Sequence, residues 1–151
     1  MQPALLGAVA NQGAAVPLTA FGGIITQYVD SGDSKTYRVH TFRSTGKFVV
    51  SSGAADVDWL VIAGGGGGGH NGRAGGGAGG SQTGTGYAVS AGTYTVTVGT
   101  GGAQNTQGTD SVALGTTSTK GGAGYEGVQD GGSGGGGVVG DTGGGTASAG
   151  Q

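Results

Sequence analysis

The sequence contains no cysteine, and only 9% of its 151 residues are charged. Without cysteine the chain forms no disulfide and offers no thiolate to a metal. The net charge of -2 provides no cationic field that would hold nucleic acid or an anionic membrane surface. No apolar run approaches 18 residues, and no basic region precedes an apolar one, so neither a membrane span nor a secretory signal is predicted. We therefore expect the protein neither to bind nucleic acid nor to insert into a membrane.

Glycine is abundant instead, at 42 of the 151 residues. An ordered glycine loses more conformational entropy than any other residue, so long glycine tracts are either flexible or held by some uncommon interaction. The first such tract follows an apolar run in DWLVIAGGGGGGHNG, residues 58–72. A strand that leads into glycines can open a nucleotide site, but a helix must follow, with either a Lys-Ser/Thr pair or an acidic residue about 20 positions on. Residues 71–86 provide none of these, so we expect no nucleotide or other cofactor.

Composition divides the chain into an N-terminal arm, residues 1–27, and a glycine-rich β domain, residues 28–151. The arm holds both prolines and few charges, and it is expected to lie extended along a partner. The domain contains glycine tracts at about residues 64–86 and 121–146. Strand signals occur in KTYRVHTF, KFVVS, VDWLVIA, SAGTYTVTVGTGG and, more weakly, DSVALG. Turn-forming residues in SGDS, RSTGK and SSGAAD separate the first of these segments.

These patterns predict a mostly β fold, a small antiparallel jelly-roll-like β-sandwich with polyglycine-II-type glycine-rich insertions. Trp59 and Tyr94 alternate with their neighbours and are expected to fill the sandwich core. A flexible linker is the alternative for the glycine tracts, but linkers are usually Gly/Ser mixtures without regular apolar residues. A polyproline-II-like glycine helix leaves its backbone groups unpaired when alone, so such helices must pack against one another. The irregular spacing of the glycines excludes collagen.

No residue pattern indicates catalysis or metal binding. His40 and His70 have no second histidine or acid at ligand spacing, and neither lies in a nucleophile motif such as G-x-S-x-G. The scattered aspartates fit turns and strand ends better than a calcium loop, since DVDWL turns apolar after two acids. We expect a protein that is not an enzyme. The candidate surface-recognition residues are Tyr87, Tyr125, His70 and Arg73, which lie in or beside the glycine tracts.

The chain from about residue 37 to 145 resembles the glycine-rich domain of tailed-bacteriophage virion proteins. The resemblance is carried by HTFRSTGKFVVSSGAADVDWLVIAGGGGGG and by SAGTYTVTVGTGGA, followed by GTDSVALG and GGAG. It implies a structural component, tail-fibre-like or a decoration protein of the head, on the outer surface of the virion. The arm at residues 1–27 lies outside the resemblance and is expected to anchor the chain to another virion structural protein.

The low apolar content suggests that subunits bury surface against each other, and a homotrimer is the expected assembly. One alternative is a receptor-binding adhesin module that recognises bacterial surface glycans through the loops between glycine helices. Aromatic side chains such as Tyr87 and Tyr125 suit that role, because they combine an apolar face with a polar tip. Another alternative, an ice-binding protein, needs a flat face of regularly spaced small residues, which the irregular glycine spacing does not provide.

Overall fold

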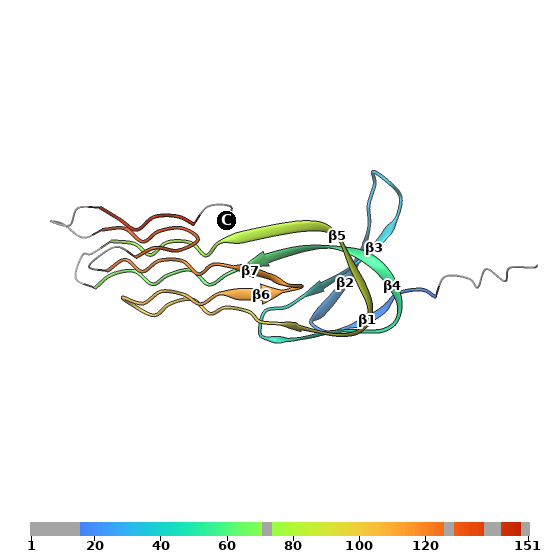
Figure 1. Ribbon diagram of the computed structural model, residues 1–151. Coiled ribbons are helices and arrows are strands. Elements are labelled where there is room, and N and C mark those ends of the chain that lie inside the picture. The colour runs from blue at the N-terminus through green and yellow to red at the C-terminus, as the bar shows by residue number, and fades with distance from the viewer. Residues whose placement is uncertain (1–15, 71–73, 126–128, 138–142, 149–151) are drawn as a thin grey trace, which may run out of the picture.

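The computed structural model describes residues 16–70, 74–125, 129–137 and 143–148. These residues form β-strands and extended segments, with no helix among them, and therefore none that could cross a bilayer. The strands are β1 (Thr19–Phe21), β2 (Ile24–Val29), β3 (Thr36–Thr41), β4 (Gly46–Ile62), β5 (Ser81–Val96), β6 (Ser111–Ala113) and β7 (Thr116–Ser118). Figure 1 shows the strands at one end of an elongated molecule and the glycine-rich segments at the other.

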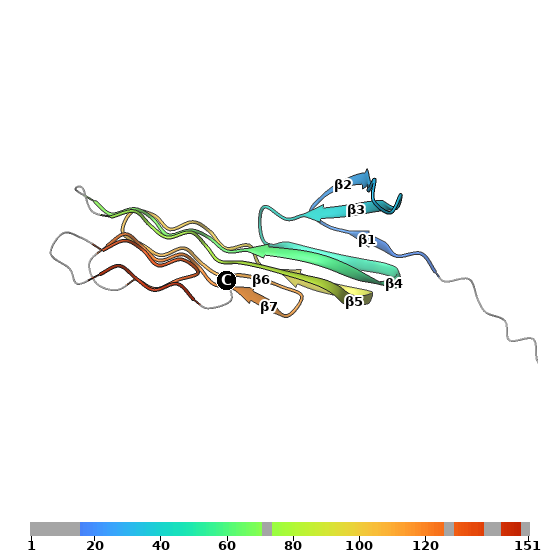
Figure 2. The ribbon, with the colours of Figure 1, turned by 90° about the horizontal axis from the view of Figure 1, so that it is seen from above.

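All strand pairs are antiparallel, and they form three open sheets. The largest has the order β1-β4-β5, while β2 pairs with β3 and β6 pairs with β7 as separate hairpins. In Figure 2 the β2–β3 hairpin stands off one side of the three-stranded sheet. The prediction of a mostly β, antiparallel fold is therefore confirmed.

β4 is one continuous strand where the sequence predicts two strands separated by a turn at SSGAAD. Its pairing with β5 shifts register between Val50 and Ala54. Gly53 lies in this shift with a φ of 77°, a conformation that glycine adopts without steric cost. The ladder resumes at Ala54, so the segment is a bulge in a bent strand. Figure 1 shows that β4 and β5 bend together.

The core is small and lies on the inner face of this bent pair of strands. Ala20, Val50 and Val89 are buried together, and partly buried side chains from β4 and β5 pack against them. Among these, the ring of Tyr94 lies 6.1 Å from that of Phe48. The prediction that Tyr94 contributes to the core is confirmed.

Trp59 lies outside the central cluster. It alternates with exposed neighbours on β4 and is half-buried. A Cβ atom placed on Gly84, in the paired strand, would overlap the indole ring. The glycine at this position therefore lets the indole pack closely against β5.

The N-terminal boundary differs from the predicted one. Residues 19–27 were assigned to a free arm, but Thr19–Phe21 pairs with β4, and the predicted boundary at residue 27 falls inside β2. Of the remainder of the predicted arm, residues 16–18 precede β1 without forming a strand, and residues 1–15 lie outside the described residues. A short hairpin was also missed: β6 was predicted from DSVALG, but its partner β7 was not. The turn between them places Leu114 and Gly115 at positive φ, and the side chain of Leu114 packs on the core.

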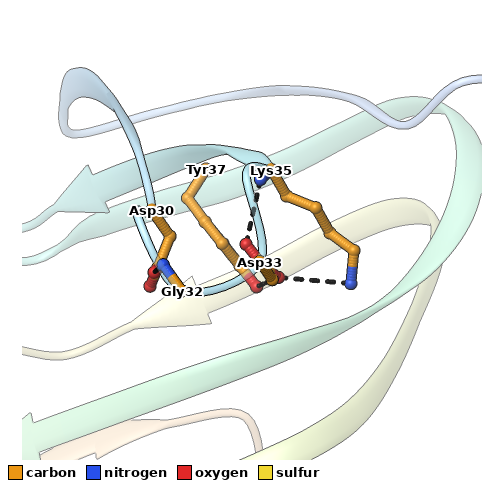
Figure 3. A network of polar contacts seen from close by, with 5 residues as sticks. All are labelled: Asp30, Gly32, Asp33, Lys35 and Tyr37. Atoms are coloured by element: carbon orange, nitrogen blue, oxygen red, sulfur yellow. Dashed lines mark hydrogen bonds and ion pairs between the residues drawn. The ribbon is translucent and has the colours of Figure 1, made fainter.

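The turn between β2 and β3 is fixed by aspartate side chains, as Figure 3 shows. Asp30 Oδ1 accepts from the backbone N–H of Gly32 at 2.6 Å, and Asp33 Oδ1 accepts from that of Lys35 at 2.9 Å. The Tyr37 hydroxyl donates to Asp33 Oδ2 at 2.8 Å, and Lys35 Nζ lies 3.2 Å from the same oxygen. The backbone bond from Lys35, followed by the Tyr37 hydroxyl, lowers the pKa of Asp33, while Asp33 raises the pKa of Tyr37. These contacts match the ordinary turn chemistry of aspartate.

Candidate functional site: the glycine segments and their far end

The glycine segments are the extended stretches 63–69, 74–80, 98–103, 105–110, 119–125, 129–137 and 143–148. In Figures 1 and 2 they run alongside one another and continue away from the ends of the strands. We call the end remote from the strands the far end. The sequence alone leaves open whether such stretches are ordered. Their hydrogen bonds show whether they are.

Segment 63–69 pairs with segment 74–80 through backbone bonds that recur every three residues. The N–H groups of Ala63, Gly66 and Gly69 donate to the carbonyls of Gly80, Gly77 and Ala74, at 3.0, 2.8 and 2.8 Å respectively. In a β-ladder the side of the strand that faces a neighbour repeats every two residues. The spacing here is three, so this pairing is not a continuation of the β4–β5 ladder.

The same segment bonds in further directions with the same spacing. The N–H groups of Gly64 and Gly67 donate to the carbonyls of Thr109 and Thr106, at 3.0 and 2.9 Å. The carbonyls of Gly65 and Gly68 accept from Gly102 and Asn105, and those of Gly64 and Gly67 accept from Gly121 and Gly124, all at 2.8 to 3.0 Å. Segment 63–69 is thus held by four neighbouring segments. The amides of Ala63, Gly64, Gly66, Gly67 and Gly69 donate to these carbonyls, so they are not free to bind a phosphate.

Close approach of the backbones explains why glycine is needed. A Cβ atom on Gly66 would overlap the carbonyl of Gly122, and one on Gly67 would overlap that of Ala103. Gly121 and Gly122 are buried, with neighbouring backbone at similarly short range. Only a hydrogen atom fits at such positions. The composition therefore reflects packing of backbone against backbone.

Aspartate side chains replace backbone partners at the edges of the glycine segments. Asp110 Oδ1 accepts from the N–H of Lys120 at 2.8 Å. Asp130 Oδ1 accepts from the N–H and the hydroxyl of Thr146, at 2.7 and 2.8 Å, and these two bonds lower the pKa of Asp130. Both aspartates act as structural acceptors that join segments distant in sequence.

Two of the four candidate recognition residues lie at the same end of the glycine segments, the far end. Segments 63–69 and 119–125 run parallel, since Gly121 and Gly124 donate to Gly64 and Gly67. His70 and Tyr125, which end these segments, are therefore carried to the same end, and both are exposed.

Of the other two candidates, one lies in a strand and one lies outside the described residues. Tyr87 lies in β5, where it is partly buried and packs against the core, so it is not brought together with His70 and Tyr125. Arg73 lies outside the described residues.

Asn105 is a far-end residue that the sequence analysis missed. Its side-chain Oδ1 accepts from the N–H of His70 at 2.9 Å, and its own N–H donates to Gly68 at 3.0 Å. It has a φ of 62°, a conformation that asparagine tolerates better than most residues. The sequence signal that identifies this position is an asparagine between two glycine-rich stretches.

The described part of the chain contains no group of three or more His, Cys, Asp or Glu side chains arranged to hold a metal ion. His40 Nδ1 lies 2.8 Å from the carbonyl oxygen of Gly22, and its ring packs edge-on against Phe48 at 5.0 Å. This histidine is accounted for by packing and a hydrogen bond.

Comparison with known proteins gives one match. The model of a family described as a glycine-rich domain matches residues 41–151, which include most of the strands and all the glycine segments. No curated protein and no solved structure matches the chain.

Proposed function

Because the chain belongs to the glycine-rich domain family, we propose that it is a non-enzymatic structural protein on the outer surface of a phage virion, tail-fibre-like or a decoration protein of the head. The observation that carries this proposal is the bonding of segment 63–69 to four neighbours at three-residue spacing. A bundle bonded through its backbone makes a stiff projection, which suits an external virion component. The sequence resemblance to phage virion proteins supports the same role.

The proposal includes a conformation for the glycine segments, the polyglycine II helix. This helix has three residues per turn, so every third residue faces the same neighbour. That period accounts for the donors at residues 63, 66 and 69 and for those at residues 64 and 67. The joint bending of β4 and β5 supports a jelly-roll-like sandwich for the strand end, with the glycine helices continuing from it.

Attachment is assigned to the N-terminal arm. β1 lies at the strand end of the molecule, opposite the far end (Figures 1 and 2). Because residues 19–27 are engaged in β1 and β2, the residues ahead of β1 carry the docking role in this proposal. Self-association, with a homotrimer as the proposed state, would bury the apolar surface that a single chain leaves exposed.

Removal of residues 1–15 is expected to abolish incorporation of the chain into virions while leaving its melting temperature unchanged. The deletion removes the arm and no described strand. Quantitative mass spectrometry of purified particles measures incorporation, and a chain with residues 1–15 in shuffled order serves as the control for length. Full incorporation of the truncated chain would contradict the arm assignment. Absence of the full-length chain from purified particles would overturn the virion proposal itself.

The second candidate function is a receptor-binding adhesin for bacterial surface glycans. The observation that favours it is the location of exposed His70 and Tyr125 at the far end, where they would face away from an anchored arm. Imidazole and phenol groups suit sugar recognition because they offer ring faces and polar atoms together.

For an adhesin, the double variant His70→Ala/Tyr125→Ala is expected to lose saturable binding to host cells, with an affinity at least about tenfold lower, equivalent to about 1.4 kcal/mol. Thr83→Ala/Thr85→Ala, on exposed positions of β5, is the control and should bind normally. Titration of labelled full-length chain onto cells gives both affinities. If the unmodified chain shows no saturable binding, the adhesin role fails and the structural role stands.

A further inference from the structure

The β2–β3 hairpin is too exposed to be explained by the single chain. All six residues of β2 are exposed, including Ile24, Tyr28 and Val29 at 54%, 51% and 66%. On β3, Tyr37 and Val39 are exposed as well. A two-stranded hairpin is at best marginally stable in water unless another layer covers one of its faces. This hairpin therefore presents apolar side chains that a partner would stabilise.

A hollow of about 1200 Å³ lies beside the hairpin. Its lining includes Tyr28, Tyr37 and Val39 from the hairpin and Leu60 and Ile62 from β4. Leu60 and Ile62 are more than half exposed. Pockets for small molecules usually measure about 300–1,000 Å³ and enclose most of the ligand. The size and the apolar lining favour a protein segment as the occupant.

The exposed apolar side chains of this region are numerous. Those of the hairpin and of the end of β4 are 38% to 66% exposed: Ile24, Ile25, Tyr28, Val29, Tyr37, Val39, Leu60 and Ile62. A standard interface takes about 800 Å² from each partner. The largest apolar patch on a typical monomer is about 300–600 Å². Both surfaces, the protruding hairpin and the hollow, belong to the same chain, so a second copy supplies the complement to each.

Four charged side chains line the same hollow, the cation Arg38 and the carboxylates Asp30, Asp56 and Asp58. Asp30 and Asp58 each accept a hydrogen bond from a backbone N–H, that of Gly32 and that of Gly86. The side chains of Arg38 and Asp56 are exposed, and neither side chain forms an ion pair or hydrogen bond with any residue in the described part of the chain. Charges that enter an interface need a partner, because burying an unpaired charge is strongly destabilising. A second copy would bring an Asp56 to each Arg38.

We propose that the hairpin of one copy occupies the hollow of another, with Arg38 facing Asp56 of the partner subunit and the apolar side chains closing around this pair. Because each chain carries both halves, the contact repeats from copy to copy, and it closes into a ring when the rotation between copies brings the last hairpin to the first hollow. This inference rests on the proposed self-association and is independent of the virion role.

The test measures the molar mass of the full-length chain by light scattering over a range of concentrations. Arg38→Asp and Asp56→Arg are each expected to weaken association about tenfold or more, since close interfacial charge pairs couple strongly. The double variant, Arg38→Asp with Asp56→Arg, restores the opposite charges and is expected to regain the association of the unmodified chain. Arg43→Asp makes the same charge reversal at an exposed residue outside the hollow and should have no effect.

The outcomes separate the contact from the proposals on which it rests. A monomeric unmodified chain at every concentration would overturn both self-association and this contact, without touching the virion role, which is tested on particles. An oligomer that neither single reversal weakens would overturn the contact alone. Failure of the double variant to reassociate, with both single variants weakened, would overturn the Arg38–Asp56 pairing.

Discussion

Gly66→Ala is expected to disrupt the glycine segments and lower the melting temperature of the chain by about 10 °C. The added methyl group would overlap the carbonyl of Gly122 in a neighbouring segment. The obstacle is backbone, which cannot rotate away as a side chain can, and both segments are held by further hydrogen bonds. Overpacking of this kind costs about 3 kcal/mol, and in a chain of this length that corresponds to about 10 °C. Differential scanning calorimetry of the full-length chain gives the shift.

Gly68→Ala is the matched control, two residues further along the same tract. A Cβ atom there would lie 4.0 Å from the carbonyl oxygen of Ala74, an ordinary van der Waals contact. The residue is exposed and has no positive φ, so alanine is compatible with its conformation. Stability should stay the same or rise by about 0.4–1 kcal/mol, because alanine restricts the unfolded chain. Equal melting temperatures for the two variants would mean that the tract is a flexible linker.

The strands could be predicted from the sequence wherever side chains alternate. Tyr37 and Val39 indicate β3, and Tyr94 and Val96 indicate the end of β5. Alternation identifies a strand because successive side chains point to opposite faces. Alternation gives no information where small residues stand in place of alternating large and polar side chains. Residues 81–86, SQTGTG, were assigned to a glycine tract and are instead the first part of β5.

The bulge in β4 was misassigned for a related reason. Ser-Ser-Gly is typical of turns, and a glycine at positive φ occurs in turns and bulges alike. Whether the chain reverses at Gly53 or continues depends on the partner strand, which resumes pairing at Ser90. Pairing between residues so far apart in sequence cannot be inferred from local composition.

The candidate site shows the same limit. His70 and Tyr125 lie beside glycines in the sequence, and this position predicts that both side chains are exposed. Their location at the same end depends on segments 63–69 and 119–125 running parallel. Glycine has no side chain to specify direction or register, so the sequence leaves both open. Tyr87 was grouped with them because it follows a glycine-rich stretch, and the structure places it in a strand against the core.

Ordering the glycine segments has a large cost in conformational entropy. That loss, on the order of 1–2 kcal/mol per residue for the backbone, must be offset without side-chain burial. A single hydrogen bond contributes a net of about 1 kcal/mol, so one partner segment would not suffice. Segment 63–69 has four partners, and most of its amides and carbonyls form hydrogen bonds with them. Order in any one segment therefore depends on the presence of its neighbours, and the bundle should fold and unfold as a unit.

Hydrogen exchange of the native chain is expected to show a three-residue period within the six consecutive glycines. Gly66 and Gly67 donate hydrogen bonds to neighbouring segments, while no bond is donated by the amides of Gly65 and Gly68 to any residue that the structure describes. The bonded amides can exchange only when the bundle opens, so they should exchange on the order of a thousandfold more slowly than the unbonded ones.

Exchange rates read residue by residue by NMR distinguish this arrangement from the alternatives. A β-ladder would protect every second amide, and a flexible linker would leave all of them equally fast. The comparison is internal, because these residues are chemically identical and differ only in the direction in which each N–H points. Protection of two amides in every three would follow from a threefold helix with bonded neighbours on two of its sides. Uniformly fast exchange across the tract would contradict the stiff bundle on which the structural role depends.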